Sequence, residues 1–149
     1  MKASATLASN LQKALVDLIE LHLQAKQAHW NVVGHNFRDL HLQLDEIVES
    51  SREFADSAAE RMRALHAVPD GRTATVAATT LLKPFPEGLA NTKDVVDLIG
   101  DRLDQAAGTM RDIHDEVDAE DPTTADLLHQ YIEKLEQYSW MVRSENTTV

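Results

Sequence analysis

Apolar residues recur at spacings of three and four along four long stretches of this chain, and this periodicity limits the fold more than any other feature. The stretches run roughly over residues 6–33, 37–65, 92–117 and 121–144. Such spacing places the apolar side chains on one face of an α-helix. Helices of this length are each about 30 Å long at ~1.5 Å per residue, which suits an elongated bundle. The sequence therefore predicts an all-α fold.

Turn-forming residues divide the predicted helices. Gly34 is expected to end the first helix, and the short link that follows predicts that the first two helices are antiparallel neighbours. Asp121 and Pro122 supply a good N-cap and a good first residue for the last helix, which is joined tightly to the third. The connection over about residues 66–91 is long and holds three of the four prolines. One long central crossover is typical of a ferritin-like four-helix bundle, and TATVAATTLL is expected to form a short helix within it.

Composition and charge exclude several classes of protein. The length of 149 residues predicts one domain over residues 1–149. The chain has no cysteine, which excludes disulfides, zinc–thiolate sites, iron–sulfur clusters and thiol catalysis, so any metal must be held by histidine and carboxylates. A net charge of −11 attracts cations and repels nucleic acid as a whole. The sequence shows neither an apolar run of about 20 residues nor a signal-peptide core, so we expect a cytoplasmic protein without a membrane partner.

Two pairs of candidate metal ligands lie on the second predicted helix. His41 and Asp45 are four positions apart, as are Asp56 and Glu60, so each pair shares a helix face and can chelate a metal. No Glu is followed by His three positions later, which argues against the di-iron centre that some ferritin-like proteins build inside one bundle. From Asp45 to Asp56 the helix advances about 16 Å at ~1.5 Å per residue. One ion therefore cannot touch both pairs of a single chain.

Two interpretations of these pairs remain open. In the first interpretation the two pairs are separate features of a solvated helix face, and Arg52 between them is an ordinary salt-bridge partner. In the second, two copies of the helix from different subunits run antiparallel across a two-fold axis. In the second case the His-Asp pair of one subunit meets the Asp-Glu pair of the other, and the site occurs twice. His29 lies one loop away, where the Gly34 turn can bring it close. Two imidazoles and three carboxylates form an oxygen-rich set that suits iron. The sequence assigns no metal role to the other histidines: His22, His35, His66, His114 and His129.

The residues around these ligands resemble a known family. KQAHWNVVGHNFRDLHLQLDEIVE, followed by DSAAERMRAL, is similar to the signature of Dps proteins, the DNA-binding proteins from starved cells, or mini-ferritins. The motif has three ordered parts, HWNVxG, FxxLHxxxD and DxxAER. The similarity continues through DPTTADLL and YSWMVRSEN and covers almost the whole chain. The resemblance implies a four-helix bundle with a short crossover helix, and a hollow shell of twelve subunits.

The resemblance also implies roles for individual residues. The ferroxidase site would lie at the two-fold interface and use five side chains, three from one subunit and two from its partner: His29, His41 and Asp45, then Asp56 and Glu60. Trp30 would pack beside the iron, although an interface or core aromatic is a compatible alternative. Acids near the start of the last helix would line a three-fold pore that admits iron. Asp126 matches that pore best, and Asp121 is the second candidate, although it is also a predicted N-cap.

The implied activity is the oxidation of Fe(II), preferentially with hydrogen peroxide rather than oxygen, and mineralisation of the ferric product in the shell. Two ferrous ions give peroxide two electrons, so that no hydroxyl radical is released and DNA is protected. A nucleoid-associated DNA-binding protein with incidental metal binding is the alternative, and a structural helical oligomer is a third. Direct DNA binding has little support, because Lys2 is the only side-chain cation before the first helix and twelve chains at −11 each carry −132.

Overall fold

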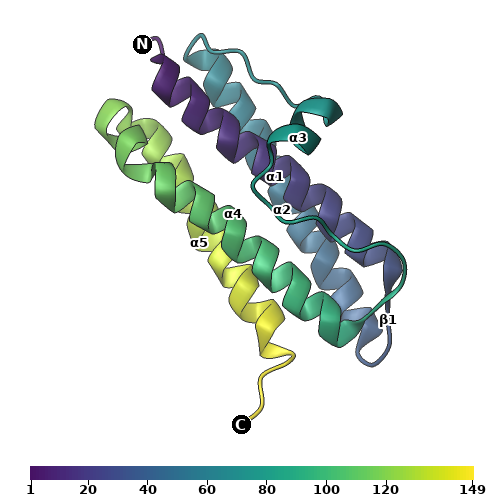
Figure 1. The fold of residues 1–149 in the computed structure, drawn as a ribbon. Coiled ribbons are helices and arrows are strands. Elements are labelled where there is room, and N and C mark those ends of the chain that lie inside the picture. The colour runs from purple at the N-terminus through teal and green to yellow at the C-terminus, as the bar shows by residue number, and fades with distance from the viewer.

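The computed structural model describes all 149 residues and contains five α-helices and one short parallel β-ladder (Figure 1). The elements follow one another as α1 (Ala5–Asn31), β1 (Val32–Val33), α2 (Phe37–Ala64), α3 (Thr73–Thr79), β2 (Ala90–Asn91), α4 (Thr92–Glu120) and α5 (Pro122–Ser144). The four predicted long helices are confirmed, with ends that differ from the expected ones by up to three residues. The short crossover helix is confirmed as α3, inside TATVAATTLL.

The four long helices form two hairpins that pack side by side. α1 packs against α2 and α4 packs against α5, while α1 also contacts α4 (Figure 1). Their facing sides form one apolar cluster to which every long helix contributes fully buried residues, among them Leu18, Leu44, Leu103 and Leu128. Burying such a side chain stabilises the fold by about 1.5–3 kcal/mol. No helix combines the length and the apolar character that a membrane span requires.

A buried aspartate ties the crossover to the bundle. Asp17 of α1 is only 1% exposed. Its carboxylate accepts hydrogen bonds from the Thr80 hydroxyl and the Leu81 amide, both at 2.8 Å, and from the Thr109 hydroxyl of α4 at 2.7 Å. A buried carboxylate needs such donors, because burial removes its hydration. Asp17 therefore ties the residues after α3 to both α1 and α4.

The second half of the crossover is fixed by a buried arginine and by the β-ladder. Arg102 of α4 donates to the backbone carbonyls of Lys83 at 2.9 Å and Pro84 at 2.8 Å. Val32 and Val33 then pair in parallel with Ala90 and Asn91. Two-residue strands have no recognisable periodicity, so the sequence did not predict this ladder. It holds the start of α4 beside the turn that joins α1 to α2.

Candidate metal site

His29 and His41 hold each other through their backbones. The Nδ1 atom of His29 lies 2.7 Å from the carbonyl oxygen of His41, and Nδ1 of His41 lies 2.9 Å from that of His29. The rings stack with their centroids 3.6 Å apart. Because a carbonyl only accepts hydrogen bonds, each Nδ1 carries a proton, and the lone pair of each neutral ring is on Nε2. Metal-binding histidines are commonly oriented in this way, with one nitrogen on a carbonyl and the other free to ligate.

The turn between α1 and α2 brings these two histidines together. His29 lies in the last turn of α1 and His41 near the start of α2, and Gly34, with φ of +115°, allows the chain to reverse between them. His29 is buried, and His41 is half-buried beneath the Phe37 ring at a centroid distance of 5.0 Å. Trp30 is 68% exposed in the single chain. This exposure excludes Trp30 from the core of the single chain, so of the two alternatives only an aromatic at a subunit interface is left.

Asp45 lies one helical turn beyond His41 and has a cation partner that the sequence did not indicate. Its Oδ1 atom is 2.5 Å from Nζ of Lys26 on α1 and 3.5 Å from Nδ1 of His29. The hydrogen bond from Lys26 lowers the pKa of Asp45, so the carboxylate is ionised and able to bind a cation at neutral pH. Arg52, the alternative salt-bridge partner, forms no ion pair with Asp45, Asp56 or Glu60.

Asp56 and Glu60 lie further along the same helix and are exposed. They line a shallow surface depression together with Ser57 and Arg61. α2 is continuous from Phe37 to Ala64, so the rise of about 16 Å between Asp45 and Asp56 applies to the folded chain. No group of three or more His, Asp and Glu side chains in the chain is placed to hold one metal ion. His29, His41 and Asp45 are neighbours in the single chain but do not by themselves form a metal-binding group, and the Asp56–Glu60 pair lies apart from them.

The two pore candidates have different surroundings. Asp121 is 4% exposed, and its carboxylate accepts hydrogen bonds from Nη2 of Arg61 at 2.6 Å and from the Thr124 hydroxyl. Burial opposes ionisation of Asp121, but the hydrogen bonds from Thr124 and Arg61 outweigh it and lower the pKa. This carboxylate anchors the start of α5 to α2, which argues against the pore role considered for it. Asp126 is exposed, and its Oδ1 atom lies 3.6 Å from Nδ1 of His129.

Comparison with known proteins places this chain among ferritin-like proteins over most of its length. The family described as Ferritin-like domain matches residues 8–148. DNA protection during starvation protein 2 of Deinococcus radiodurans is 36% identical over 141 residues, which cover 90% of this chain and 56% of that relative. The chain therefore spans little more than half the length of that relative. DNA protection during starvation protein of Agrobacterium fabrum is 32% identical over 143 residues, which cover 95% of this chain and 88% of the relative.

Solved structures show the same architecture. DpsA14 from Streptomyces coelicolor superimposes with a TM-score of 0.92 at 32% identity, covering 96% of this chain and 85% of that chain. Dps92 from Deinococcus radiodurans superimposes with a TM-score of 0.90 at 34% identity, covering 93% and 84%. Coverage this high includes most of the crossover as well as the four long helices.

Proposed function

The chain belongs to the Dps family of ferritin-like proteins, and from this premise we propose that it oxidises Fe(II) and stores the ferric product inside a dodecamer of identical chains, each a single domain over residues 1–149. One observation carries the proposal. The reciprocal hydrogen bonds of His29 and His41 hold both Nδ1 atoms and leave both Nε2 atoms for a metal, one helical turn from an ionised Asp45.

The complete site is formed by two subunits. His29, His41 and Asp45 of one chain meet Asp56 and Glu60 of another, across a two-fold axis that runs between antiparallel α2 helices. Two features of the single chain support this arrangement. A continuous α2 cannot bring its own two ligand pairs together, and Asp56 and Glu60 are exposed where a second subunit can reach them.

The proposed reaction takes one electron from each of two Fe(II) ions. Hydrogen peroxide accepts these two electrons and two protons and becomes two water molecules, so no hydroxyl radical is released. The three carboxylates favour the product, because Fe(III) carries one more positive charge than Fe(II). Peroxide is the preferred oxidant in this proposal, with oxygen as the slower alternative. Iron reaches the interior through an acidic three-fold pore to which Asp126 contributes, and Trp30 packs beside the site in the assembled shell.

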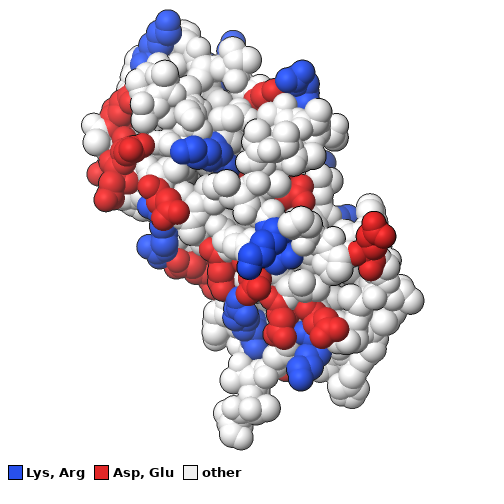
Figure 2. Space-filling model, in the orientation of Figure 1, with Lys and Arg blue, Asp and Glu red and all other residues white.

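Protection of DNA follows from this chemistry, because it removes both Fe(II) and peroxide. Figure 2 shows carboxylates gathered in groups on one face of the chain, with lysines and arginines scattered between them rather than collected in a basic patch. Such a surface attracts Fe(II) more readily than phosphate. We therefore propose a cytoplasmic protein that protects DNA without binding it. A DNA gel shift by the wild-type protein at about 150 mM salt would favour the nucleoid-associated alternative.

The test is to replace Asp56 and Glu60 with alanine in the assembled protein. Fe(II) is loaded without oxygen, one portion of peroxide is added, and ferric absorbance is followed. We expect oxidation to slow by at least about tenfold, since even the loss of a group that only hydrogen-bonds to a metal ligand typically costs ~10–100-fold in metal affinity or activity. The matched control is Glu87→Ala with Asp112→Ala, which removes two exposed carboxylates outside the site. Oxidation at the wild-type rate by an intact Asp56→Ala/Glu60→Ala shell would disprove the site assignment.

A further inference from the structure

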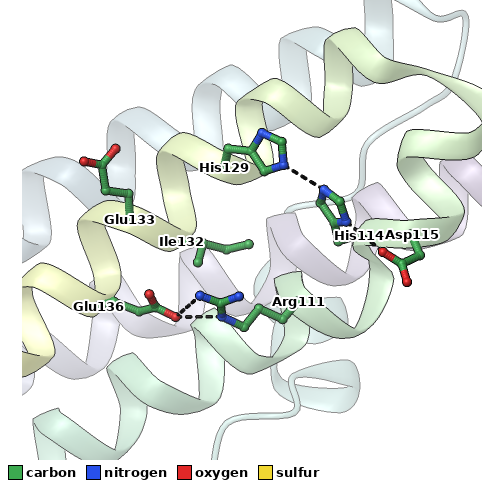
Figure 3. A pocket seen from close by; sticks show the side chains of 7 residues that line it. All are labelled: Arg111, His114, Asp115, His129, Ile132, Glu133 and Glu136. Atoms are coloured by element: carbon green, nitrogen blue, oxygen red, sulfur yellow. Dashed lines mark hydrogen bonds and ion pairs between the residues drawn. The ribbon is translucent and has the colours of Figure 1, made fainter.

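A second histidine pair lies on the other hairpin, away from the proposed iron site. The Nε2 atom of His114 on α4 lies 2.7 Å from Nε2 of His129 on α5, and the rings stack with centroids 4.8 Å apart. Figure 3 shows the two rings extending toward each other from neighbouring helices. In the single chain the pair is accessible to solvent, with side-chain exposures of 26% for His114 and 57% for His129.

A carboxylate lies behind each ring. Oδ1 of Asp115 is 3.0 Å from Nδ1 of His114, and Oδ1 of Asp126 is 3.6 Å from Nδ1 of His129. The ionised Asp115 carboxylate only accepts hydrogen bonds, so it favours the His114 tautomer in which Nδ1 carries the proton and Nε2 the lone pair. Asp126 is beyond hydrogen-bond distance from His129 and acts on that ring through its negative charge. The lone pair on Nε2 of His114 therefore faces Nε2 of His129 at 2.7 Å, a separation that requires either a proton donated by His129 or a metal cation between the two atoms. A carboxylate behind each imidazole is also the usual arrangement around metal-bound histidine.

The charge around the pair favours a cation. The surface depression that contains both histidines is also lined by Arg111, Glu133 and Glu136. Glu136 pairs with Arg111 at 2.6 Å and offsets the positive charge that would otherwise oppose a metal ion. Glu133 lies one helical turn beyond His129 and points away from the rings in Figure 3, so it adds negative charge without occupying the space between them. Carboxylates therefore outnumber cations around the two Nε2 atoms.

We propose that His114 and His129 form a binding site for a divalent transition-metal cation of the zinc type, with the two Nε2 atoms as ligands and water in the remaining positions. Zinc binds imidazole nitrogen at ~2.0–2.1 Å, so two ligands at a tetrahedral angle lie about 3.3 Å apart. The rings must therefore separate by about 0.6 Å from their present distance, which exposed side chains can do. The ligand set is mainly imidazole and suits zinc, copper or nickel, whereas the proposed iron site is richer in carboxylate.

The proposal is tested by counting bound zinc in assembled, metal-stripped protein by equilibrium dialysis with Zn²⁺. All proteins compared carry Asp56→Ala and Glu60→Ala, so that zinc at the proposed iron site contributes less. Adding His114→Ala and His129→Ala should remove about one zinc per chain. The matched control adds His35→Ala and His66→Ala, which are exposed and have no histidine partner, and should leave the count unchanged. An unchanged count in the His114→Ala/His129→Ala protein overturns the proposal, as does an equal loss in the control.

A second measurement keeps the test decisive if the double histidine variant fails to assemble. A crystal soaked in Zn²⁺ should give an anomalous peak within ~2.0–2.1 Å of both Nε2 atoms. His129→Gln, at an exposed position of α5, should abolish that peak in an intact shell. Zinc bound only elsewhere in the wild-type crystal would show that the pair shares a proton and binds no metal. Neither measurement depends on iron oxidation, so the zinc site and the proposed function can fail separately.

Discussion

At the scale of single residues, Lys26 places a positive charge at the proposed iron site. Its ammonium group lies 2.5 Å from Oδ1 of Asp45, one of the two carboxylate oxygens that could bind a metal ion. The same hydrogen bond keeps Asp45 ionised by lowering its pKa. Lys26 thus keeps the carboxylate ionised, and its positive charge beside Asp45 opposes the binding of a metal cation there.

This competition predicts that Lys26→Met strengthens Fe(II) binding. A half-exposed ion pair is worth ~0.5–1 kcal/mol, so its removal should raise the affinity by about two- to fivefold. Anaerobic Fe(II) titration of the assembled protein measures the change, and Lys13→Met, at an exposed position of α1, is the control. Unchanged or weaker binding by Lys26→Met would show that Lys26 does not compete with the metal.

Helical spacing in the sequence identified the candidate metal ligands, but it could not predict which side chains of different helices touch. His41 and Asp45 follow from their separation along one helix. The Lys26–Asp45 pair and the reciprocal hydrogen bonds of His29 and His41 depend on how α1 and α2 are rotated about their axes. The His114–His129 contact was missed for the same reason, because its two residues lie on different helices. Asp121 is a pore candidate by sequence because it lies near the start of the last helix, and its burial against Arg61 leaves no signal in the local sequence.

At the scale of elements, the sequence predicted the helices but not the hydrogen bonds that hold the crossover against them. Periodic apolar residues located the four long helices, and the proline-rich segment located the crossover. Asp17 is the exception to the periodicity, since it is an acid on a buried face of α1. Only the packed structure shows that its carboxylate is matched by Thr80, Leu81 and Thr109.

We expect Asp17→Ala to release the crossover while the four long helices persist. The change leaves the Leu81 amide and the Thr80 hydroxyl without their acceptor, and a loss of about 2 kcal/mol makes local opening about thirtyfold more frequent. Trypsin cleavage after the exposed Arg72, at the start of α3, measures this opening, with Asp112→Ala as a surface control. Cleavage of Asp17→Ala at the wild-type rate, with intact helical circular dichroism, would mean that Arg102 and the β-ladder suffice to hold the segment.

At the scale of the whole molecule, the single chain leaves large apolar side chains uncovered. Trp30 is 68% exposed and Trp140 67%, and Phe37, Leu42 and Met141 are each more than two-fifths exposed. Trp30 and Phe37 lie beside the His29–His41 pair, so a partner subunit that covered them would also exclude water from the proposed iron site. The proposed function therefore predicts that subunit assembly and iron oxidation depend on the same surface.

Shared sites predict that two inactive variants restore each other. The first variant is His29→Ala/His41→Ala, and the second is Asp56→Ala/Glu60→Ala. A dimer of one chain of each kind has one site with both defects and one site with none. Co-expression of differently tagged chains gives mixed shells, and purification through both tags isolates them for the peroxide assay.

Random pairing makes half of the dimers mixed, and each mixed dimer has one intact site of two, so we expect about one quarter of the wild-type activity. Shells that combine two tagged copies of the Asp56→Ala/Glu60→Ala chain are the control and should stay inactive. If all five ligands belonged to one chain, every site in a mixed shell would carry a defect. Mixed shells that contain both chains in equal amounts and are as inactive as the control would therefore disprove the two-subunit site. Recovered activity would support it, because no single chain in these shells carries all five ligands.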